Sequence, residues 1–249
     1  MDQERQVVQD GLDVSYRALC LGGLMARSLM ELSVRTISDP NMRAFNTDKN
    51  ARLQQWLEYE GVMPYFSHKE AELLSRPVGS WAQQELIDAS WRTEGLGMLL
   101  WALRIYSDVP AYDTAFSSEQ ALNQIKLGLP IEEFLRHCHL RSEHDIYRER
   151  ALAQLWHWRA RTRRVERAGI TPPDGWTYES MVAQTAHQAF LKGDIPSPID
   201  GDFPALGRAY TDLSEAEYSR VNSIAVERHY AMNWLCWYTE DWDDVPLDT

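Results

Sequence analysis

The sequence has little cysteine. Its 249 residues include only Cys20, Cys138 and Cys236, which are far apart and form no C-x-x-C pair. This excludes a disulfide framework, because such a framework needs an even, closely patterned set of cysteines. A few unpatterned cysteines are typical of reduced thiols in the cytoplasm, and we therefore expect a cytoplasmic protein.

Long apolar runs are also lacking. The most apolar early stretch, residues 18–25, is short and lies between Arg17 and Arg27. A membrane-spanning helix needs about 20 apolar residues, so we expect no contact with a membrane. Residues 1–5 have neither the positive region nor the apolar region of a signal peptide, which argues against secretion.

Basic residues are outnumbered. The chain has 25 Lys and Arg against 37 Asp and Glu, a net charge of −12, with a hydrophobic fraction of 44%. Nucleic-acid binding is therefore unlikely, because such proteins normally carry a basic surface; an acidic protein is better suited to a basic partner.

One region, residues 136–167, departs from this balance with nine basic and four acidic residues. We expect the arginines of this arginine-rich segment to pair with acidic residues of the C-terminal tail or to project into solvent. The arginines for which we expect this are Arg148, Arg150, Arg159 and Arg163. A nucleic-acid contact by this segment is the weaker interpretation.

Motifs of common catalytic and cofactor sites are missing. The chain has no G-x-S-x-G, no P-loop, no G-x-G-x-x-G and no H-E-x-x-H. These patterns mark nucleophile elbows, phosphate cradles and zinc sites, so we predict neither a metal nor a cofactor.

Helical patterns run through nearly the whole chain. Ser67, Ser80, Ser117 and Ser214 each stand three residues before a Glu or Gln, which is the capping-box pattern of a helix start. Apolar residues between these starts recur every three to four positions. We predict helices over residues 11–36, 48–60, 68–76, 81–106, 118–127, 131–138, 143–168, 178–192 and 215–238.

The predicted fold class is all-α, with little or no strand. We expect one compact multi-helix domain of about nine helices over residues 1–249, in which the helices of residues 1–64 are considered as a sub-lobe. The only long irregular segment that we predict is residues 193–204.

Three blocks of sequence stand out. Residues 91–103 read WRTEGLGMLLWAL, residues 227–235 read ERHYAMNWL, and residues 242–249 read WDDVPLDT. In this order they resemble the family called domain of unknown function 4272, over residues 10–249. The resemblance implies a helical domain and no particular reaction.

The first block places charged residues in an otherwise apolar helix. A buried carboxylate must be paired or it takes up a proton, and Arg228 is the partner that we expect for Glu94. Gly95 and Gly97 each destabilise a helix by about 1 kcal/mol relative to Ala, which favours a close approach of another helix. The favoured interpretation is a structural polar network made of Arg92, Glu94, Arg228, Asn233 and Asp243.

A catalytic interpretation of the same blocks stays open. His229 and Asn233 are one helical turn apart, and an amide at that distance can orient an imidazole as a general base. Glu94, Arg228, His229 and Asp244 then form the candidate catalytic set. Convergence of these side chains on an open cleft favours an enzyme, whereas burial with mutual pairing argues against one.

The acidic tail has two interpretations. It packs back onto the domain through Trp242 and Val245, with Asp243 or Asp244 capturing an arginine of the arginine-rich segment, or it presents carboxylates to a metal or a basic partner. We favour packing.

The favoured functional hypothesis is a cytoplasmic protein-binding module. It fits an immunity or inhibitor protein that neutralises a basic toxin, for example a nuclease effector of type VI secretion, because opposite charge speeds capture. The expected contact residues are acidic side chains assumed to be exposed: Asp194, Asp200, Asp202, Asp212, Glu215 and Glu217. The alternative is a hydrolase or transferase with a pocket around Glu94, Arg228 and His229.

Overall fold

The computed structural model describes residues 8–37, 39–136, 138–236 and 238–247. These residues form nine α-helices, three short 3-10 helices and one small hairpin, which confirms the all-α prediction. In chain order the elements are α1 (Gly11–Thr36), α2 (Pro40–Tyr59), η1 (Met63–Tyr65), α3 (His68–Ser75), α4 (Gln83–Ala102), α5 (Ser118–Ile125), α6 (Glu132–Leu135), α7 (Glu143–Arg167), α8 (Tyr178–Lys192), β1 (Pro204–Ala205), β2 (Arg208–Ala209), η2 (Tyr210–Asp212), α9 (Glu215–Leu235) and η3 (Trp242–Asp244).

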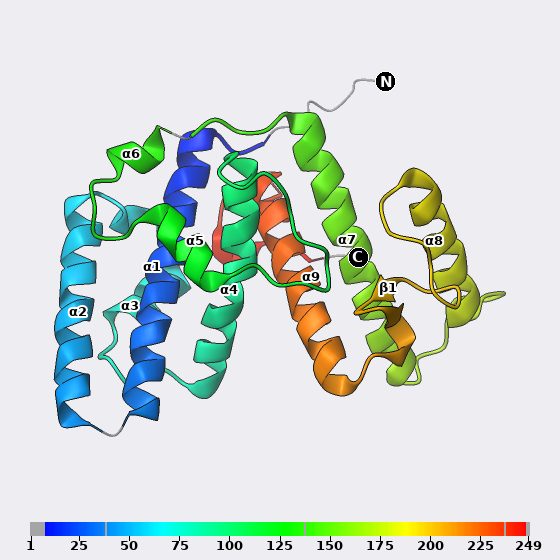
Figure 1. Ribbon diagram of the computed structural model, residues 1–249, viewed down its shortest axis with the longest axis horizontal. Helices are drawn as coiled ribbons and strands as arrows, with labels where there is room; N and C mark the ends of the chain where they lie inside the picture. The colour runs from blue at the N-terminus through cyan, green and yellow to red at the C-terminus, as the bar shows by residue number, and fades with distance from the viewer. Residues whose placement is uncertain (1–7, 38, 137, 237, 248–249) are drawn as a thin grey trace.

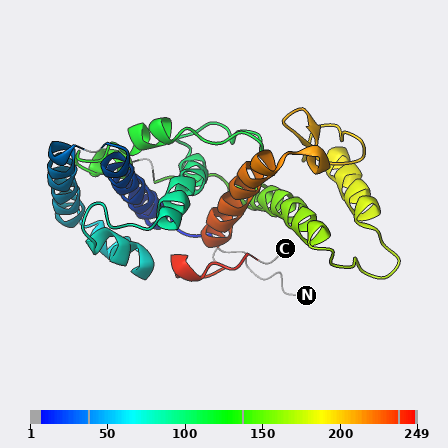
Figure 2. The ribbon, with the colours of Figure 1, turned by 90° about the horizontal axis from the view of Figure 1, so that it is seen from below.

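The long helices lie side by side in a row. Across the molecule the order is α2, α1, α4, α9, α7 and α8, and each neighbouring pair is in contact (Figure 1). The last long helix of the chain, α9, therefore lies between α4 and α7, which come much earlier in the sequence. Figure 2 shows the same row from below, with the C-terminal segment against α9. A central position requires α9 to bury side chains on more than one face, which its buried residues do.

Most helix starts follow the predicted capping chemistry. Ser67 and Ser214 form complete capping boxes, and Ser117 accepts a hydrogen bond from the Gln120 amide. The prediction for Ser80 is wrong: α4 begins at Gln83, and Glu85 accepts a hydrogen bond from the backbone amide of Ala82. The prediction also lacks the first two turns of α2, because Asp39 and Pro40 start that helix well before residue 48.

Several predicted helices end too late. α4 ends at Ala102 instead of residue 106, and α6 covers only Glu132–Leu135. α9 ends at Leu235, and residues 137 and 237 of the predicted helices lie outside the described residues.

A second long irregular segment, residues 103–117, contradicts the prediction that residues 193–204 are the only one. It contains no helix or strand, yet Tyr112 and Phe116 are buried within it. The other irregular segment, residues 193–204, contains an isolated bridge between Ile199 and Asp202. It continues into the β1–β2 hairpin, in which Pro204 lies opposite Ala209. Both irregular segments therefore contribute to the core.

The glycines of the first sequence block differ in their surroundings. A Cβ atom on Gly97 would lie 2.3 Å from the ring of Phe116, far inside normal contact, whereas one on Gly95 would lie 3.6 Å from Leu21 and 3.7 Å from Ala231. The close approach expected of a neighbouring helix therefore exists at Gly97, but an irregular segment makes it instead.

Replacing Gly97 by Ala should destabilise the fold. The added methyl group displaces Phe116, and overpacking of this kind costs about 1–3 kcal/mol. Gly95→Ala is the matched control, because its methyl group fits and alanine favours the helix by about 1 kcal/mol. Urea unfolding of both variants checks this; equal stability of the two would contradict the described packing.

Candidate functional site

The two central residues of the predicted polar network form a buried ion pair between α9 and α4. Arg228 is 0% exposed and Glu94 is 1% exposed, and Arg228 Nε lies 2.9 Å from Glu94 Oε2. Arg228 also donates to the carbonyl oxygens of Pro110 at 2.7 Å and Thr114 at 2.8 Å. The pair therefore joins two helices and fixes the irregular segment of residues 103–117.

Glu94 is fully engaged on the other side. Its Oε1 accepts a hydrogen bond from the Phe116 amide at 2.9 Å, and the guanidinium of Arg228 lies over the rings of Tyr112 and Phe116. Burial raises the pKa of the Glu94 carboxyl, and the charge of Arg228 opposes that rise. Both charged groups are thus committed to structural contacts.

Arg92 is not bonded to this pair, although the predicted polar network included it. Arg92 Nη1 lies 2.9 Å from Glu227 Oε2, and its guanidinium lies over the ring of Tyr230. Arg92 precedes Glu94 by two residues, so the two side chains leave α4 in different directions.

His229 faces the opposite neighbour. Successive helical residues point about 100° apart, so His229 contacts α7 while Arg228 contacts α4. His229 Nδ1 lies 2.9 Å from Nδ1 of His157, and both imidazoles are buried. One nitrogen donates and the other accepts, so at least the accepting ring is neutral.

Burial lowers the pKa of both histidines. It lowers the pKa of His157 to about 4, with a further contribution from Arg161 and Arg164. It lowers the pKa of His229 to about 3, helped by His157 and Arg150. The expected contact of His229 with Asn233 does not form: Asn233 accepts a hydrogen bond from Arg150 and donates one to the Pro246 carbonyl.

The candidate catalytic residues do not converge on one cleft. Glu94 and Arg228 are buried against each other, and His229 is buried against His157 on another face of α9. Asp244 is exposed in η3. The arrangement is the one that argues against catalysis at these four residues.

Three of the six acidic contact residues predicted on the 194–217 region are engaged in ion pairs, although one of them, Glu215, stays exposed. Asp202 was expected to be exposed, but it is buried, with 5% exposure. Its carboxylate lies 2.6 Å from Arg159 Nε and 2.5 Å from Arg159 Nη2. Glu215 pairs with Arg167, and Glu217 accepts from Ser214 and pairs with Arg208 at 3.5 Å.

The other three predicted contact residues keep some exposure. Asp200 and Asp212 are exposed, and Asp194 is half-buried. In the arginine-rich segment, Arg159 pairs with Asp202, Arg163 with Glu166 and Arg167 with Glu215.

The C-terminal segment packs back onto the domain. Trp242 and Val245 are buried, and the Tyr230 hydroxyl donates to the Trp242 carbonyl. Asp243 was predicted to capture an arginine of the arginine-rich segment, but its carboxylate has other partners. It accepts hydrogen bonds from the Ser67 hydroxyl at 2.7 Å and the Lys69 amide at 2.9 Å, and so caps α3. The last two residues of the third block, 248 and 249, lie outside the described residues.

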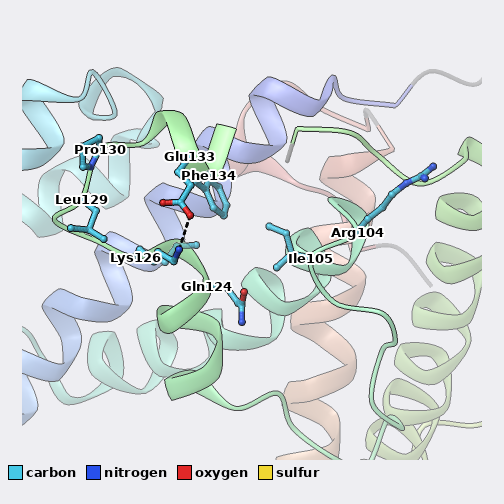
Figure 3. Close-up of a pocket in the computed structure, with 9 residues that line it drawn as sticks. Arg104, Ile105, Gln124, Lys126, Leu129, Pro130, Glu133 and Phe134 are labelled. Atoms are coloured by element: carbon cyan, nitrogen blue, oxygen red, sulfur yellow. Dashed lines mark hydrogen bonds and ion pairs between the residues drawn. The ribbon is translucent and has the colours of Figure 1, made fainter. Parts of the chain in front are cut away.

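One surface cavity of about 270 Å³ lies beside α5 and α6. Figure 3 shows Lys126 and Glu133 joined across it by an ion pair of 2.9 Å, while Arg104 points away from the other side chains. Ile105, Leu129 and Phe134 give it an apolar wall (Figure 3). Its ionisable groups are occupied with each other or directed elsewhere, so it offers no acid–base pair.

A second cavity, of about 300 Å³, lies between the start of α1, residues 65–67 and the C-terminal segment. We call it the C-terminal cavity, and it is lined by Gln9, Asp13, Arg17, Tyr65, Phe66, Ser67, Trp234, Glu240, Asp241 and Trp242. It combines four aromatic residues with three acidic ones. Of these lining residues, only Trp242 was predicted from the sequence to pack onto the domain, although a charged Arg17 at the edge of an apolar stretch is a signal of a buried polar contact.

Arg17 lies in the wall of the C-terminal cavity as half of a buried ion pair. It contacts Glu70, donates to the Tyr65 carbonyl at 3.3 Å, and lies over the ring of Trp242 at 4.8 Å. Its charge is therefore matched within the fold. By contrast, Asp13, Glu240 and Asp241 form no ion pair within the described part of the chain.

Across the described ranges, no three His, Cys, Asp or Glu side chains are grouped so as to hold a metal ion. Within the same ranges, none of the helices has the length and apolar character to cross a bilayer.

Removing the charge of Arg228 should strongly destabilise the protein. Arg228→Met leaves Glu94 buried without its partner, and breaking a buried pair in this way costs about 3–5 kcal/mol. Arg52→Met is the matched control, because Arg52 and Asp48 form an exposed pair on α2 and such pairs contribute less than about 1 kcal/mol. Denaturant unfolding measures the free energy of unfolding of both variants. Similar losses of stability would contradict a special contribution of the Glu94–Arg228 pair.

The histidine pair should make the protein sensitive to acid. Both histidines titrate lower in the folded state than the ordinary 6.5, so the unfolded state binds more protons below that pH. Stability should therefore fall as the pH drops from 6.5 towards 4, by about 1.4 kcal/mol per pH unit for each histidine. Raised carboxyl pKa values, as at Glu94, act in the opposite direction.

A comparison of variants isolates this contribution. His229→Gln should lose about 1.4 kcal/mol less per pH unit than the unchanged protein. His187→Gln, at an exposed position of α8, should keep the original slope. Chemical unfolding between pH 7 and pH 4 provides the measurement; an unchanged slope in His229→Gln would rule out the histidine pair as the cause.

Comparison with known proteins gives one match. No curated protein and no solved structure matches the chain. The family model that matches covers residues 3–183 and includes the block at 91–103, while the blocks at 227–235 and 242–249 lie beyond the matched residues. Because the match spans more than half of the 249 residues, the chain belongs to the family described as Domain of unknown function (DUF4272).

Proposed function

We propose that this protein is a binding module that captures a basic protein partner through an acidic surface beside its C-terminal segment. The observation that supports the proposal is that buried charges are paired, whereas a group of surface carboxylates is not. The four buried arginines, Arg17, Arg27, Arg159 and Arg228, are matched by carboxylates inside the fold. Within the described residues, the acidic side chains near the C-terminal cavity form no ion pair.

This acidic surface consists of Asp10, Asp13, Glu240, Asp241 and Asp244, which are exposed or half-buried. Three of its members line the C-terminal cavity, and Asp10 is close enough to Asp13 to raise the pKa of that carboxyl, after the larger effect of burial. Carboxylates gathered without counter-charges favour a cationic partner, and their field speeds its approach. The surface replaces the 194–217 region as the preferred contact.

An inhibitor or immunity protein is the specific role that fits best. Such a protein of the cytoplasm would cover a basic toxin, for example a nuclease, and the fast association that this requires is what opposite charge supplies. The hydrolase or transferase alternative receives no support from the geometry, because Glu94, Arg228 and His229 are buried in separate structural contacts.

Capture from an extract of the native host, followed by reconstitution with the purified partner, tests the proposal. We expect a partner with an isoelectric point above about 9 whose affinity falls as salt is raised. A variant with the acidic surface converted to amides should bind at least about tenfold more weakly, mainly through a slower association rate. If the partner is a toxin, binding should block its activity.

The control converts five carboxylates elsewhere, so that the net charge changes equally. Suitable exposed positions are Glu58, Glu72, Asp88, Glu119 and Asp174. A partner that is acidic, or one that binds both variants equally well, would contradict the proposed function.

A further inference from the structure

A groove with two tryptophan side chains lies at the α8 end of the row of helices (Figure 1). We call it the tryptophan groove, and it is lined by Trp158, Pro173, Trp176, Met181, Gln184 and Thr185. These residues come from α7, α8 and the connector of residues 168–177 between them. We propose that the groove binds a proline-rich segment of a partner protein in the polyproline II conformation, with a basic residue beside the prolines. None of its lining belongs to the acidic surface, so the inference goes beyond the proposed function.

Every side chain of the groove is accessible from solvent. Trp176 is 45% exposed, Pro173 and Gln184 are exposed, and the other three lining residues are half-buried. The volume of about 220 Å³ lies below the range of about 300–1,000 Å³ for sites that enclose a small molecule. A shallow groove of this size suits an extended chain that lies across it better than a compound that the protein surrounds.

Trp176 is held in place by its own connector. Its amide donates to the Pro173 carbonyl at 3.1 Å, and Gly175 has a φ of 81°, which together make a type II turn. The Tyr178 hydroxyl donates to the Ile170 carbonyl at 2.7 Å and ties the two ends of the connector together. An exposed aromatic side chain on a fixed turn loses little freedom when it binds a ligand, which favours recognition.

The lining selects an uncharged ligand that needs few hydrogen bonds. None of its side chains is charged. The Thr185 hydroxyl donates to the Met181 carbonyl within α8 at 2.8 Å, so the Gln184 amide is the main polar side chain that the groove offers. A sugar ring also stacks on tryptophan, but its hydroxyl groups need more hydrogen-bond partners than this lining supplies.

Proline meets these conditions. Its ring is apolar, it has no backbone N–H, and its fixed φ makes a polyproline II segment preformed before binding. Proline-rich segments dock into aromatic-lined grooves for this reason. Trp158 and Trp176 supply the aromatic walls, and Trp158 is supported from within by Phe203, with ring centroids 6.3 Å apart.

The indole N–H groups of the groove match the carbonyl groups of such a segment. Trp56 and Trp81 donate their indole N–H to carbonyl oxygens of the chain, whereas Trp158 and Trp176 have no acceptor within the described residues. Trp158 Nε1 is not among the fully buried unpaired atoms, and Trp176 is exposed. Because a polyproline II helix makes no internal hydrogen bonds, its carbonyl groups are free to accept from these donors.

Charge beside the groove selects the neighbour of the prolines. Asp174 in the connector and Glu179 in the first turn of α8 are exposed, and neither forms an ion pair within the described part of the chain. Burial and, after it, Arg161 and Arg164 lower the pKa of His157, so these two arginines lie toward that histidine on α7. Two unpaired carboxylates at the edge of an uncharged groove complement a basic residue next to an uncharged proline segment.

Calorimetric titration with a capped peptide of six prolines and one arginine at each end tests the inference. The matched probe has alanines in place of the prolines, so that length and charge stay the same. We expect the proline peptide to bind at least about tenfold more tightly than the alanine peptide, because its conformation is preformed. Equal binding of the two peptides, no binding of either, or binding of maltotriose in place of the proline peptide would overturn the proposal.

Substitutions at Trp176 locate the binding. Trp176→Ala should weaken the proline peptide at least about tenfold, because aromatic anchors dominate such contacts. Trp176→Phe keeps an aromatic ring and removes the indole N–H, so its loss should be smaller. Tyr59→Ala is the matched control, because that ring is 86% exposed on α2 and far from the groove in the row. Thermal unfolding shows whether each variant is folded, and unchanged binding by folded Trp176→Ala would overturn the proposed site.

A second pair of peptides tests the basic residue. Asp174→Asn with Glu179→Gln should weaken the arginine-flanked proline peptide about threefold and leave a proline peptide flanked by alanine unchanged. An equal effect on both peptides would contradict the contact with a basic residue. The proposed function is tested separately, because the acidic surface contributes no residue to the tryptophan groove and capture of a basic partner does not depend on the proline peptide.

Discussion

Buried arginines that are paired with carboxylates hold this row of helices together. Arg228 with Glu94, Arg159 with Asp202, Arg17 with Glu70 and Arg27 with Glu31 are all buried pairs, and each guanidinium also lies over an aromatic ring. A charge taken out of water is costly unless every contact is made, so each pair permits only one arrangement of the segments that supply it. The pairs therefore fix irregular segments, such as residues 103–117, as firmly as the apolar core fixes the helices.

Charged groups in the interior and charged groups on the acidic surface have different roles in this account. The buried pairs use four arginines inside the fold. Asp10, Asp13, Glu240, Asp241 and Asp244, at the start of α1 and in the C-terminal segment, form no ion pair within the described residues. α9 connects the two regions, because Arg228 and His229 lie in its core-facing middle, and Trp234 near its end lines the C-terminal cavity. We expect the interior to provide rigidity and the acidic surface to provide recognition.

Local patterns in the sequence predicted most of the helices. Contacts between segments that are distant in the sequence were mostly not predicted. Apolar spacing places α1 and α8 correctly, because that signal is local. The partner of Arg92 is Glu227 and the partner of Asp202 is Arg159, and no spacing rule identifies either. The Arg228–Glu94 contact could be predicted, since a charged residue on each of two apolar helices needs an opposite charge. The C-terminal cavity could not, because three separate segments supply its walls.

Hydrogen–deuterium exchange of the complex with the captured basic partner tests the central claim most directly. The account predicts protection at the start of α1, at residues 65–67 and at residues 240–244, with exchange around Arg228 and His229 unchanged. Protection confined to the 194–217 region or to the α5–α6 cavity, with none at the C-terminal segment, would contradict it.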